Sequence, residues 1–370
     1  MHIGLVIYGS LETLSGGYLY DRHLVARLRS LGARVTVFAR PWRHYAAHLA
    51  DHFVPQWRRA LLHARVDLWL QDELNHPSLF WLNRTLARTQ PHVPRVAIVH
   101  HLRVQERHPW PVRGLYRAVE RTYLRTLTAA VYNSRTTRDA VTALRGAPLP
   151  GLVAYPGKDS LPTPRLDAAT LWTRAHEPGP LRALAVGNLI PRKGLHVLLD
   201  ALRRLPLGTV TVDIVGRDDV HPGYARRLRA QVRRWGLGQV VRFHGRVDGS
   251  ALAGLYRRAQ VFVLPSQYEG YGIVYAEALG FGLPVLASRA GAAHEIITPG
   301  REGALVAVDD AAAIARHLAA WASQRDRLAT QAIAARARYE QLPTWDESMG
   351  QAARWLLEMA AAARSSAAAA

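Results

Sequence analysis

Two glutamates at a fixed spacing carry the clearest chemical signal in this sequence. Glu269 and Glu277 lie eight residues apart within residues 265–288, PSQYEGYGIVYAEALGFGLPVLAS. Apolar runs on either side predict a strand, a loop holding Glu269, a helix holding Glu277 and a second strand. Such units place the helix N-terminus at the carboxyl edge of a parallel sheet, where ligands bind. One carboxylate can then bind sugar hydroxyls and the other a ribose.

The start of that helix is also suited to an anion such as phosphate, because its first amides have no partner within the helix. These amides are expected at Tyr271, Gly272 and Ile273. The simpler alternative is a surface loop with two solvated acids. Glycines on both sides of Tyr271 argue against it, because an ordinary helix start does not need them.

A second candidate anion site lies upstream, at Arg192 and Lys193. Leucines at helical spacing from Leu195 onward, with Pro191 before them, predict a helix whose first turn contains both cations. Cations in a first turn oppose the helix dipole, so they indicate a bound anion; a solvated basic turn is the alternative. Lysine is otherwise rare, since Lys158 and Lys193 are the only two lysines among 48 basic residues.

The elements that must position these residues form two series. With 370 residues and 49% hydrophobic content, the chain is long enough for two domains with large cores. Valine-rich apolar runs alternate with helical patterns, which predicts parallel sheets covered on both faces. The expected strands are 2–8, 34–39, 66–70, 96–100 and 129–133, then 181–186, 210–215, 240–243, 261–264, 284–287 and 304–308.

A segment rich in proline and glycine, residues 155–180, separates the two series. The sequence therefore predicts an α/β protein with two doubly wound, Rossmann-like domains. We expect an N-terminal domain at 1–160, a C-terminal domain at 161–342, and a segment at 343–370 whose helix packs back toward the N-terminal domain and whose tail frays.

Charge and composition limit the partners. The formal net charge is +20, and residues 1–158 hold 22 basic and 9 acidic side chains, which suggests an anionic partner. Two basic segments with aromatic residues, 103–125 and 224–235, are predicted either as solvated amphipathic helices or as surfaces near anionic lipid. No apolar run is long enough to span a membrane, no signal peptide precedes the first strand, and cysteine is absent.

Three segments together resemble one family. Residues 187–202 (GNLIPRKGLHVLLDAL), residues 265–288 and residues 291–297 (GAAHEII) are similar to the retaining glycosyltransferases of family 4. The resemblance covers most of the chain and is strongest from Val186 to Val308. It implies the GT-B fold, in which two Rossmann-like domains face a central cleft.

The resemblance also implies roles for the charged residues. Arg192 and Lys193 would hold the donor diphosphate and stabilise it as the leaving group. Glu277 would bind the ribose and Glu269 the transferred sugar. Asn188 stands where many family members have arginine, so Arg192 would supply that charge.

Backbone contacts are implied as well. Two glycines after the first strand would touch the diphosphate, the helix-start amides would bind phosphate and sugar, and the base would lie after the strand that ends near residue 245. These residues are Gly16, Gly17, Tyr271, Gly272, Ile273, Gly245, Arg246 and Val247.

Two further groups follow strands of the first domain. The resemblance places His100, in preference to His101, against the sugar, although a histidine at a strand end is most often structural. Asp72 and Glu73 could suggest a metal or an acceptor hydroxyl. The family uses no metal-binding acidic pair, so we expect acceptor-side or loop residues there, and no metal site is predicted.

The expected protein is a cytoplasmic, metal-independent enzyme without a cofactor. It would move a sugar, with retention, from a UDP- or GDP-sugar to a hydroxyl of a glycan, a lipid-linked glycan or a small molecule. A peripheral contact with an anionic membrane stays open. The alternatives are a nucleotide-sugar epimerase of the same fold or a basic anion-binding protein; no motif supports specific nucleic-acid binding.

Overall fold

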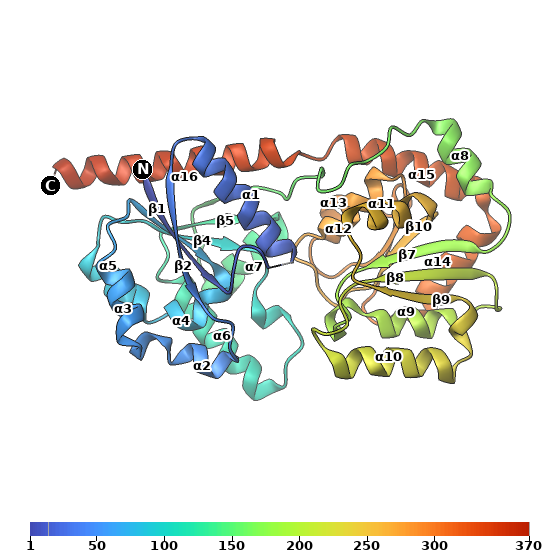
Figure 1. Cartoon of the computed structure of the whole chain (residues 1–370), viewed down its shortest axis with the longest axis horizontal. Coiled ribbons are helices and arrows are strands. Elements are labelled where there is room, and N and C mark those ends of the chain that lie inside the picture. The colour runs from blue at the N-terminus through green and yellow to red at the C-terminus, as the bar shows by residue number, and fades with distance from the viewer. Residues whose placement is uncertain (14, 370) are drawn as a thin grey trace. The chain divides into compact units, whose positions relative to one another are not determined.

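A computed structural model describes residues 1–13 and 15–369 of the chain. These residues form two compact units (Figure 1). Unit 1 consists of Met1–Pro156 together with Thr344–Ala370, and unit 2 consists of Gly157–Pro343.

Unit 1 is built on a six-stranded parallel sheet with strand order β2-β1-β3-β4-β5-β6. The strands β3, β4 and β5 are buried along their whole length, which is why they are almost entirely apolar. The strands are β1 (His2–Tyr8), β2 (Arg34–Arg40), β3 (Leu68–Asp72), β4 (Arg95–Val99), β5 (Ala129–Tyr132) and β6 (Gly151–Val153).

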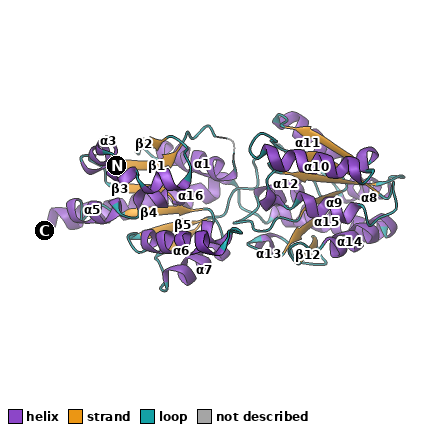
Figure 2. Cartoon of the chain, turned by 90° about the horizontal axis from the view of Figure 1, so that it is seen from below, coloured by secondary structure: helices purple, strands orange, loops and turns teal. Residues whose placement is uncertain are grey.

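Helices cover both faces of this sheet (Figure 2). They are α1 (Gly16–Ser30), α2 (Tyr45–Leu49), α3 (Pro55–Leu62), α4 (His76–Leu79), α5 (Leu82–Thr89), α6 (Trp110–Leu124), α7 (Arg135–Arg145) and α16 (Trp345–Ala369), with 3-10 turns η1 (Asp51–Phe53), η2 (Glu73–Asn75) and η3 (Arg103–Gln105).

Unit 2 repeats the design with strand order β12-β11-β10-β7-β8-β9, again all parallel. Its strands are β7 (Leu181–Val186), β8 (Val210–Val215), β9 (Val241–Gly245), β10 (Val261–Leu264), β11 (Val285–Ser288) and β12 (Gly303–Val306). Its helices are α8 (Ala168–His176), α9 (Leu195–Leu202), α10 (Pro222–Arg234), α11 (Gly249–Arg258), α12 (Ile273–Gly280), α13 (Ala293–Ile296), α14 (Ala311–Ser323) and α15 (Arg325–Glu340), with 3-10 turns η4 (Pro191–Lys193) and η5 (Leu237–Gln239).

The predicted α/β class with two doubly wound sheets is confirmed. Each of the 11 predicted strands overlaps an observed strand. The strand β6 was not predicted, because three residues are too few for a recognisable pattern. The third strand begins and ends two residues later than predicted, so Asp72 is its last residue.

In each unit the strand order reverses at one point. The chain runs from β1 to β2 on one side and from β3 to β6 on the other, so unit 1 reverses between β1 and β3. Unit 2 reverses between β7 and β10 by the same pattern. Ligands of doubly wound sheets bind at the carboxyl ends of the strands flanking this reversal.

The helix α16 packs on α1 within unit 1, and both figures show the two helices side by side. The ring of Trp345 stacks on His23 with 4.2 Å between ring centroids, and Arg27 Nη1 lies 3.1 Å from Asp346 Oδ1. Among the described residues, no helix is both long and apolar enough to cross a membrane.

This packing makes α16 part of the core of unit 1. Trp345 is 4% exposed, so we expect Trp345→Ala to lower the free energy of unfolding of unit 1 by about 3–5 kcal/mol through lost burial and a cavity. The matched control is Trp172→Ala in unit 2, because Trp172 is 45% exposed and should cost much less. Denaturant unfolding followed by fluorescence measures both. Equal losses would contradict a buried role for Trp345.

Candidate functional site

In unit 2, the candidate residues gather at the carboxyl ends of β7 and β10, the strands that flank the reversal. The turn η4 follows β7, and residues 265–272 follow β10. The backbone joins the two segments, because the Gln267 amide donates to the Arg192 carbonyl over 2.7 Å. Residues 75 positions apart in sequence are thereby held next to each other.

Arg192 and Lys193 do not lie in the first turn of the leucine-rich helix, so that prediction was wrong. They occupy a separate short 3-10 helix, η4, and α9 begins only at Leu195. Gly194 separates the two with a φ of +67°, and a Cβ there would lie 2.0 Å from the Pro265 carbonyl oxygen. The close approach of the two loops requires glycine at this position and interrupts the helix.

The two cations share a carboxylate as their partner. Lys193 Nζ lies 2.7 Å from Glu269 Oε1, and Arg192 Nη1 lies 3.4 Å from the same oxygen. Burial raises the pKa of Glu269, but the charges of Lys193 and Arg192 outweigh it and lower the pKa to about 2. Glu269 is therefore ionised, and the three side chains together carry one net positive charge. The sequence assigned them separate ligand contacts and gave no sign of this pairing.

Glu277 lies one turn into α12 and is also buried. Its Oε2 accepts a hydrogen bond of 2.9 Å from the hydroxyl of Tyr256, a buried residue of α11. Burial raises the pKa of Glu277 to about 7, against the effect of that hydrogen bond. Tyr256 fixes one carboxylate oxygen in place, and no spacing in the sequence links these two residues.

The other predicted donor residues lie along the same edge of the sheet. Asn188 follows β7, and α12 begins at Ile273 directly after Gly272 and Tyr271. Gly245 ends β9, two strands away from β7, and precedes Arg246 and Val247. The structure thus brings Arg192, Lys193 and Glu269 into contact, and the remaining unit 2 residues follow or end strands β7, β9 and β10 at the same edge of the sheet.

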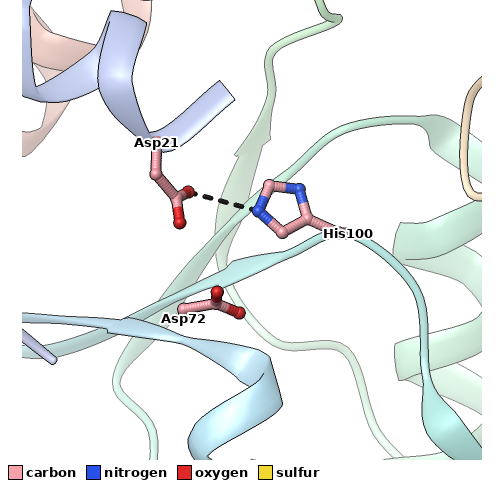
Figure 3. Close-up of side chains that lie close together, drawn as sticks. All are labelled: Asp21, Asp72 and His100. Carbon is pink, nitrogen blue, oxygen red and sulfur yellow. Dashed lines mark hydrogen bonds and ion pairs between the residues drawn. The ribbon is translucent and has the colours of Figure 1, made fainter. Parts of the chain in front are cut away.

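In unit 1, the candidate residues lie at the equivalent reversal. The helix α1 begins at Gly16 after β1, and Ser15 caps it by accepting a hydrogen bond from the Tyr18 amide. His100 follows β4, and Asp72 ends the neighbouring strand β3. Figure 3 shows Asp21, Asp72 and His100 close together, with His100 Nε2 3.2 Å from Asp21 Oδ1. His101 instead pairs with Glu106.

Asp72 and Glu73 are both 1% exposed and lie in β3 and η2, so the prediction of loop residues was wrong, while an acceptor-side role stays a prediction. Both side chains are buried because Asp72 ends a buried strand and Glu73 begins η2, which packs against α4. Burial, followed by the charge of Asp21, raises the pKa of Asp72 to about 7.

Glu73 forms a second buried group with His76 and Glu120. Burial raises the pKa values of Glu73 and Glu120 to about 8 each, which favours the protonated form of these carboxyl groups at neutral pH. In this group, and in that of Asp21, Asp72 and His100, the potential metal-ligand atoms lie within 4.8 Å of one another. By geometry, either set could hold a cation.

Comparison with known proteins identifies the family. Residues 172–338 match the family model described as glycosyl transferases group 1. In this segment the chain belongs to the group 1 glycosyltransferases. The match covers α8 to α15 and includes every candidate residue of unit 2.

Curated relatives agree with this assignment. The chain is 32% identical to glycogen synthase of Mycobacterium tuberculosis over 267 residues, which cover 70% of this chain and 59% of that protein. It is 40% identical to phosphatidyl-myo-inositol mannosyltransferase of Mycobacterium leprae over 133 residues, which cover 35% of this chain and 34% of that protein. The chain thus spans less than two thirds of the length of these relatives.

Solved structures show the shared GT-B fold. Sucrose-phosphate synthase from Thermosynechococcus elongatus superposes with a TM-score of 0.79 at 23% identity, covering 98% of this chain and 99% of that one. The Anabaena protein HepE, solved in complex with UDP-glucose, superposes with a TM-score of 0.76 at 20% identity, covering 97% and 100%. The predicted family and fold are both confirmed.

The contact between Glu269 and Lys193 predicts a pH-dependent contribution to stability. A carboxyl group with a lowered folded-state pKa stabilises the fold above its unfolded pKa, and this is lost as the pH falls toward about 2. We expect Glu269→Gln to lower the free energy of unfolding by about 3 kcal/mol at pH 7, because it leaves Lys193 buried without its counter-charge.

Denaturant unfolding at pH 7 and pH 3 measures this effect, and the penalty should shrink at the lower pH. Asp167→Asn is the control, because Asp167 is an exposed helix cap in the same unit. A Glu269→Gln penalty that is equal at both pH values would contradict the ion pair.

Proposed function

We propose that this protein is an enzyme that transfers a sugar from a nucleotide diphosphate sugar to an acceptor hydroxyl. The arrangement of Arg192, Lys193 and Glu269 at the strand reversal of unit 2 carries the proposal. Their single net positive charge and the N-terminus of α12 both favour an anion at this edge. Glu277 supplies a carboxylate for ribose hydroxyls on the same edge.

The chemistry then rests on stabilising the leaving group. Breaking the bond between sugar and phosphate leaves a nucleoside diphosphate, and Lys193 and Arg192 would offset the charge that develops on it. These cations are already oriented by Glu269 and by the Tyr268 carbonyl, to which Arg192 Nη1 donates over 2.7 Å. Little reorganisation is needed when the diphosphate forms.

The finer assignments are part of the same proposal. We propose retention of the anomeric configuration without a metal ion or cofactor, and an acceptor that is a glycan or a lipid-linked glycan. The name phosphatidyl-myo-inositol mannosyltransferase in one relative supports a lipid-linked acceptor, and the complex of HepE with UDP-glucose supports a UDP-sugar as the first donor to test.

The first experiment is a thermal-shift screen of UDP, GDP and ADP together with their sugars. A ligand that binds only the folded protein raises the melting temperature by an amount that grows with the logarithm of its concentration relative to Kd. The stabilising sugar is then incubated with and without candidate acceptors. Nucleotide diphosphate release that depends on an acceptor distinguishes transfer from epimerisation, and no stabilisation by any nucleotide would refute the proposed donor site.

Substitution of the site residues should weaken nucleotide binding. We expect Lys193→Ala to lower the affinity for the stabilising nucleotide about 10- to 100-fold in calorimetry, because a charge-assisted hydrogen bond contributes about 1.5–3 kcal/mol. Glu277→Ala should also weaken binding through loss of the ribose contact. Lys158→Ala removes the only other lysine and should leave the affinity unchanged. Equal affinities in wild type, Lys193→Ala and Glu277→Ala would reject the site assignment.

Unit 1 also offers a surface for a peripheral membrane contact. Each of residues 109–115, at the start of α6, is exposed, and this stretch includes Trp110, Val112 and Leu115. Trp110 is 87% exposed. A helix end with apolar residues exposed on all sides indicates a contact surface, and the exposed Arg107, Arg113 and Arg117 fit an anionic bilayer. We propose that the start of α6 rests on anionic lipid.

Vesicle sedimentation tests this contact. The wild type should bind vesicles of phosphatidylcholine mixed with phosphatidylglycerol, bind pure phosphatidylcholine poorly, and release at high salt. Replacing Arg113 and Arg117 by alanine should weaken binding about tenfold or more, because each basic residue contributes about 1 kcal/mol at such a surface. The control replaces Arg226 and Arg227, an equal charge change on α10 of unit 2. Equal losses in both variants would mean non-specific attraction only.

A further inference from the structure

Asp21 is a buried acid that no motif in the sequence singled out. It lies in the second turn of α1 and is fully buried. Its Oδ1 lies 3.2 Å from His100 Nε2, while its Oδ2 is buried without a hydrogen-bond partner among the described residues. A buried, half-satisfied carboxylate is costly, so its position beside His100 needs a physical reason.

The His100 ring is held from several sides. A Cβ on Gly17 would lie 3.1 Å from the ring carbon Cδ2, so the first turn of α1 packs directly against the imidazole. The ring of Tyr20 meets it edge-on with 5.3 Å between centroids, and Asn133 Nδ2 donates to the His100 carbonyl over 2.8 Å. The ring therefore has one defined orientation, with 11% of the side chain exposed.

The two ring nitrogens face different surroundings. Nε2 points at Asp21, and Figure 3 shows Nδ1 on the side of the ring away from Asp21. A carboxylate can only accept, so Nε2 carries a proton in this pair. Nδ1 is the atom left for a ligand at the carboxyl edge of the sheet.

The charges around the ring favour its protonated form. Burial lowers the pKa of His100, but the hydrogen bond to Asp21 and the charges of Asp21, Asp72 and Glu73 outweigh it, and the pKa lies above the ordinary histidine value. Asp72 lies beside Asp21, with their carboxyl groups within 4.8 Å of each other. Burial, followed by the charge of Asp21, raises the pKa of Asp72 to about 7, which favours a proton on Asp72.

We infer that Asp21 is a positioning residue that holds His100 as a charged hydrogen-bond donor, with Nδ1–H presented to an oxygen atom of a ligand at the carboxyl edge of the unit 1 sheet. A carboxylate on the far side of the ring fixes its orientation and keeps both nitrogens protonated. The ligand contact rests on the proposed function, whereas the pair formed by Asp21 and His100 exists in the protein alone. Asp72 acts as the proton-carrying neighbour that lets the Asp21 carboxylate be buried.

The pair can be tested without any substrate. Protein labelled with 15N-histidine gives two-bond proton–nitrogen correlations that report the charge and tautomer of each ring, and His100→Gln assigns the signal. The wild-type His100 signal should be that of an imidazolium through neutral pH. In Asp21→Asn the midpoint should fall by about one pH unit or more, because the charge is lost while the burial remains.

Two matched variants sharpen this result. Asp72→Asn mimics the protonated carboxyl group and should shift the midpoint much less than Asp21→Asn. Asp139→Asn removes an exposed acid of α7 and should not shift it. An unchanged midpoint in Asp21→Asn, or a neutral wild-type ring with its proton on Nδ1, would overturn the inference. The wild-type spectrum decides the second point even where a variant fails to fold.

The ligand contact is tested with the donor found by thermal shift. Asp21→Asn should lower kcat about tenfold or more at pH 7.5 and move the basic limb of the pH–rate profile to lower pH, while Asp139→Asn, a change at an exposed acid of α7, keeps the wild-type profile. If Asp21→Asn weakens binding of the nucleotide sugar but not of the free nucleotide, the contacted oxygen belongs to the sugar. If it weakens binding of both equally, the contacted oxygen belongs to phosphate. Unchanged kinetics would overturn the ligand contact.

These experiments separate the two failures. Absence of transfer with every donor and acceptor would refute the proposed function, while the titration of His100 would still decide whether Asp21 holds the charged ring. Normal transfer with an unchanged titration midpoint in Asp21→Asn would refute the inference alone.

Discussion

Residues far apart in a doubly wound chain meet only where their strands are neighbours in the sheet. Lys193 and Glu269 come into contact because β7 and β10 are hydrogen-bonded partners, although β8 and β9 lie between them in the chain. The turn after β7 and the loop after β10 therefore lie next to each other, and the Gln267 amide joins them by donating a hydrogen bond to the Arg192 carbonyl. The interruption of the helix at Gly194 also follows from this adjacency, because Gly194 lies directly against the Pro265 carbonyl oxygen.

Unit 1 obeys the same constraint with different chemistry. There the neighbouring strands β3 and β4 bring Asp72 and His100 to one edge of the sheet. The helix α1 contributes Asp21, which lies beside His100. Unit 2 collects cations around one carboxylate, whereas unit 1 collects carboxyl groups around one imidazole. One edge is suited to an anion and the other to proton-sharing groups, although the two sheets have the same design.

The sequence predicted much of this and failed in identifiable places. Continuous apolar runs identify buried parallel strands, so 11 of the strands and the positions of Glu269 and Glu277 were predicted correctly. Local spacing cannot show which strands become neighbours, so the pairing of Glu269 with the two cations was missed. The periodicity of the leucines also concealed the break at Gly194, because a left-handed glycine leaves no trace in a hydrophobic pattern.

Buried partners were the hardest residues to predict. Asp21 lies four residues after Gly17 in an ordinary amphipathic helix, and Tyr256 lies in a helix of another strand–helix unit than Glu277. Their importance comes from burial and from a single contact, neither of which leaves a pattern in sequence. Glycine, proline and charge signal a site, whereas the residues that orient its side chains are seen only in three dimensions.

The position of α16 has a consequence for how the chain acquires its structure during synthesis. Unit 2 is one continuous segment, but unit 1 needs residues from both sides of it. During translation unit 2 can complete its core while unit 1 still lacks the helix that packs on α1. The surface of α1 around His23 and Arg27 is therefore uncovered until synthesis of unit 2 is over. Unit 1 begins to be synthesised before unit 2 but completes its core after it.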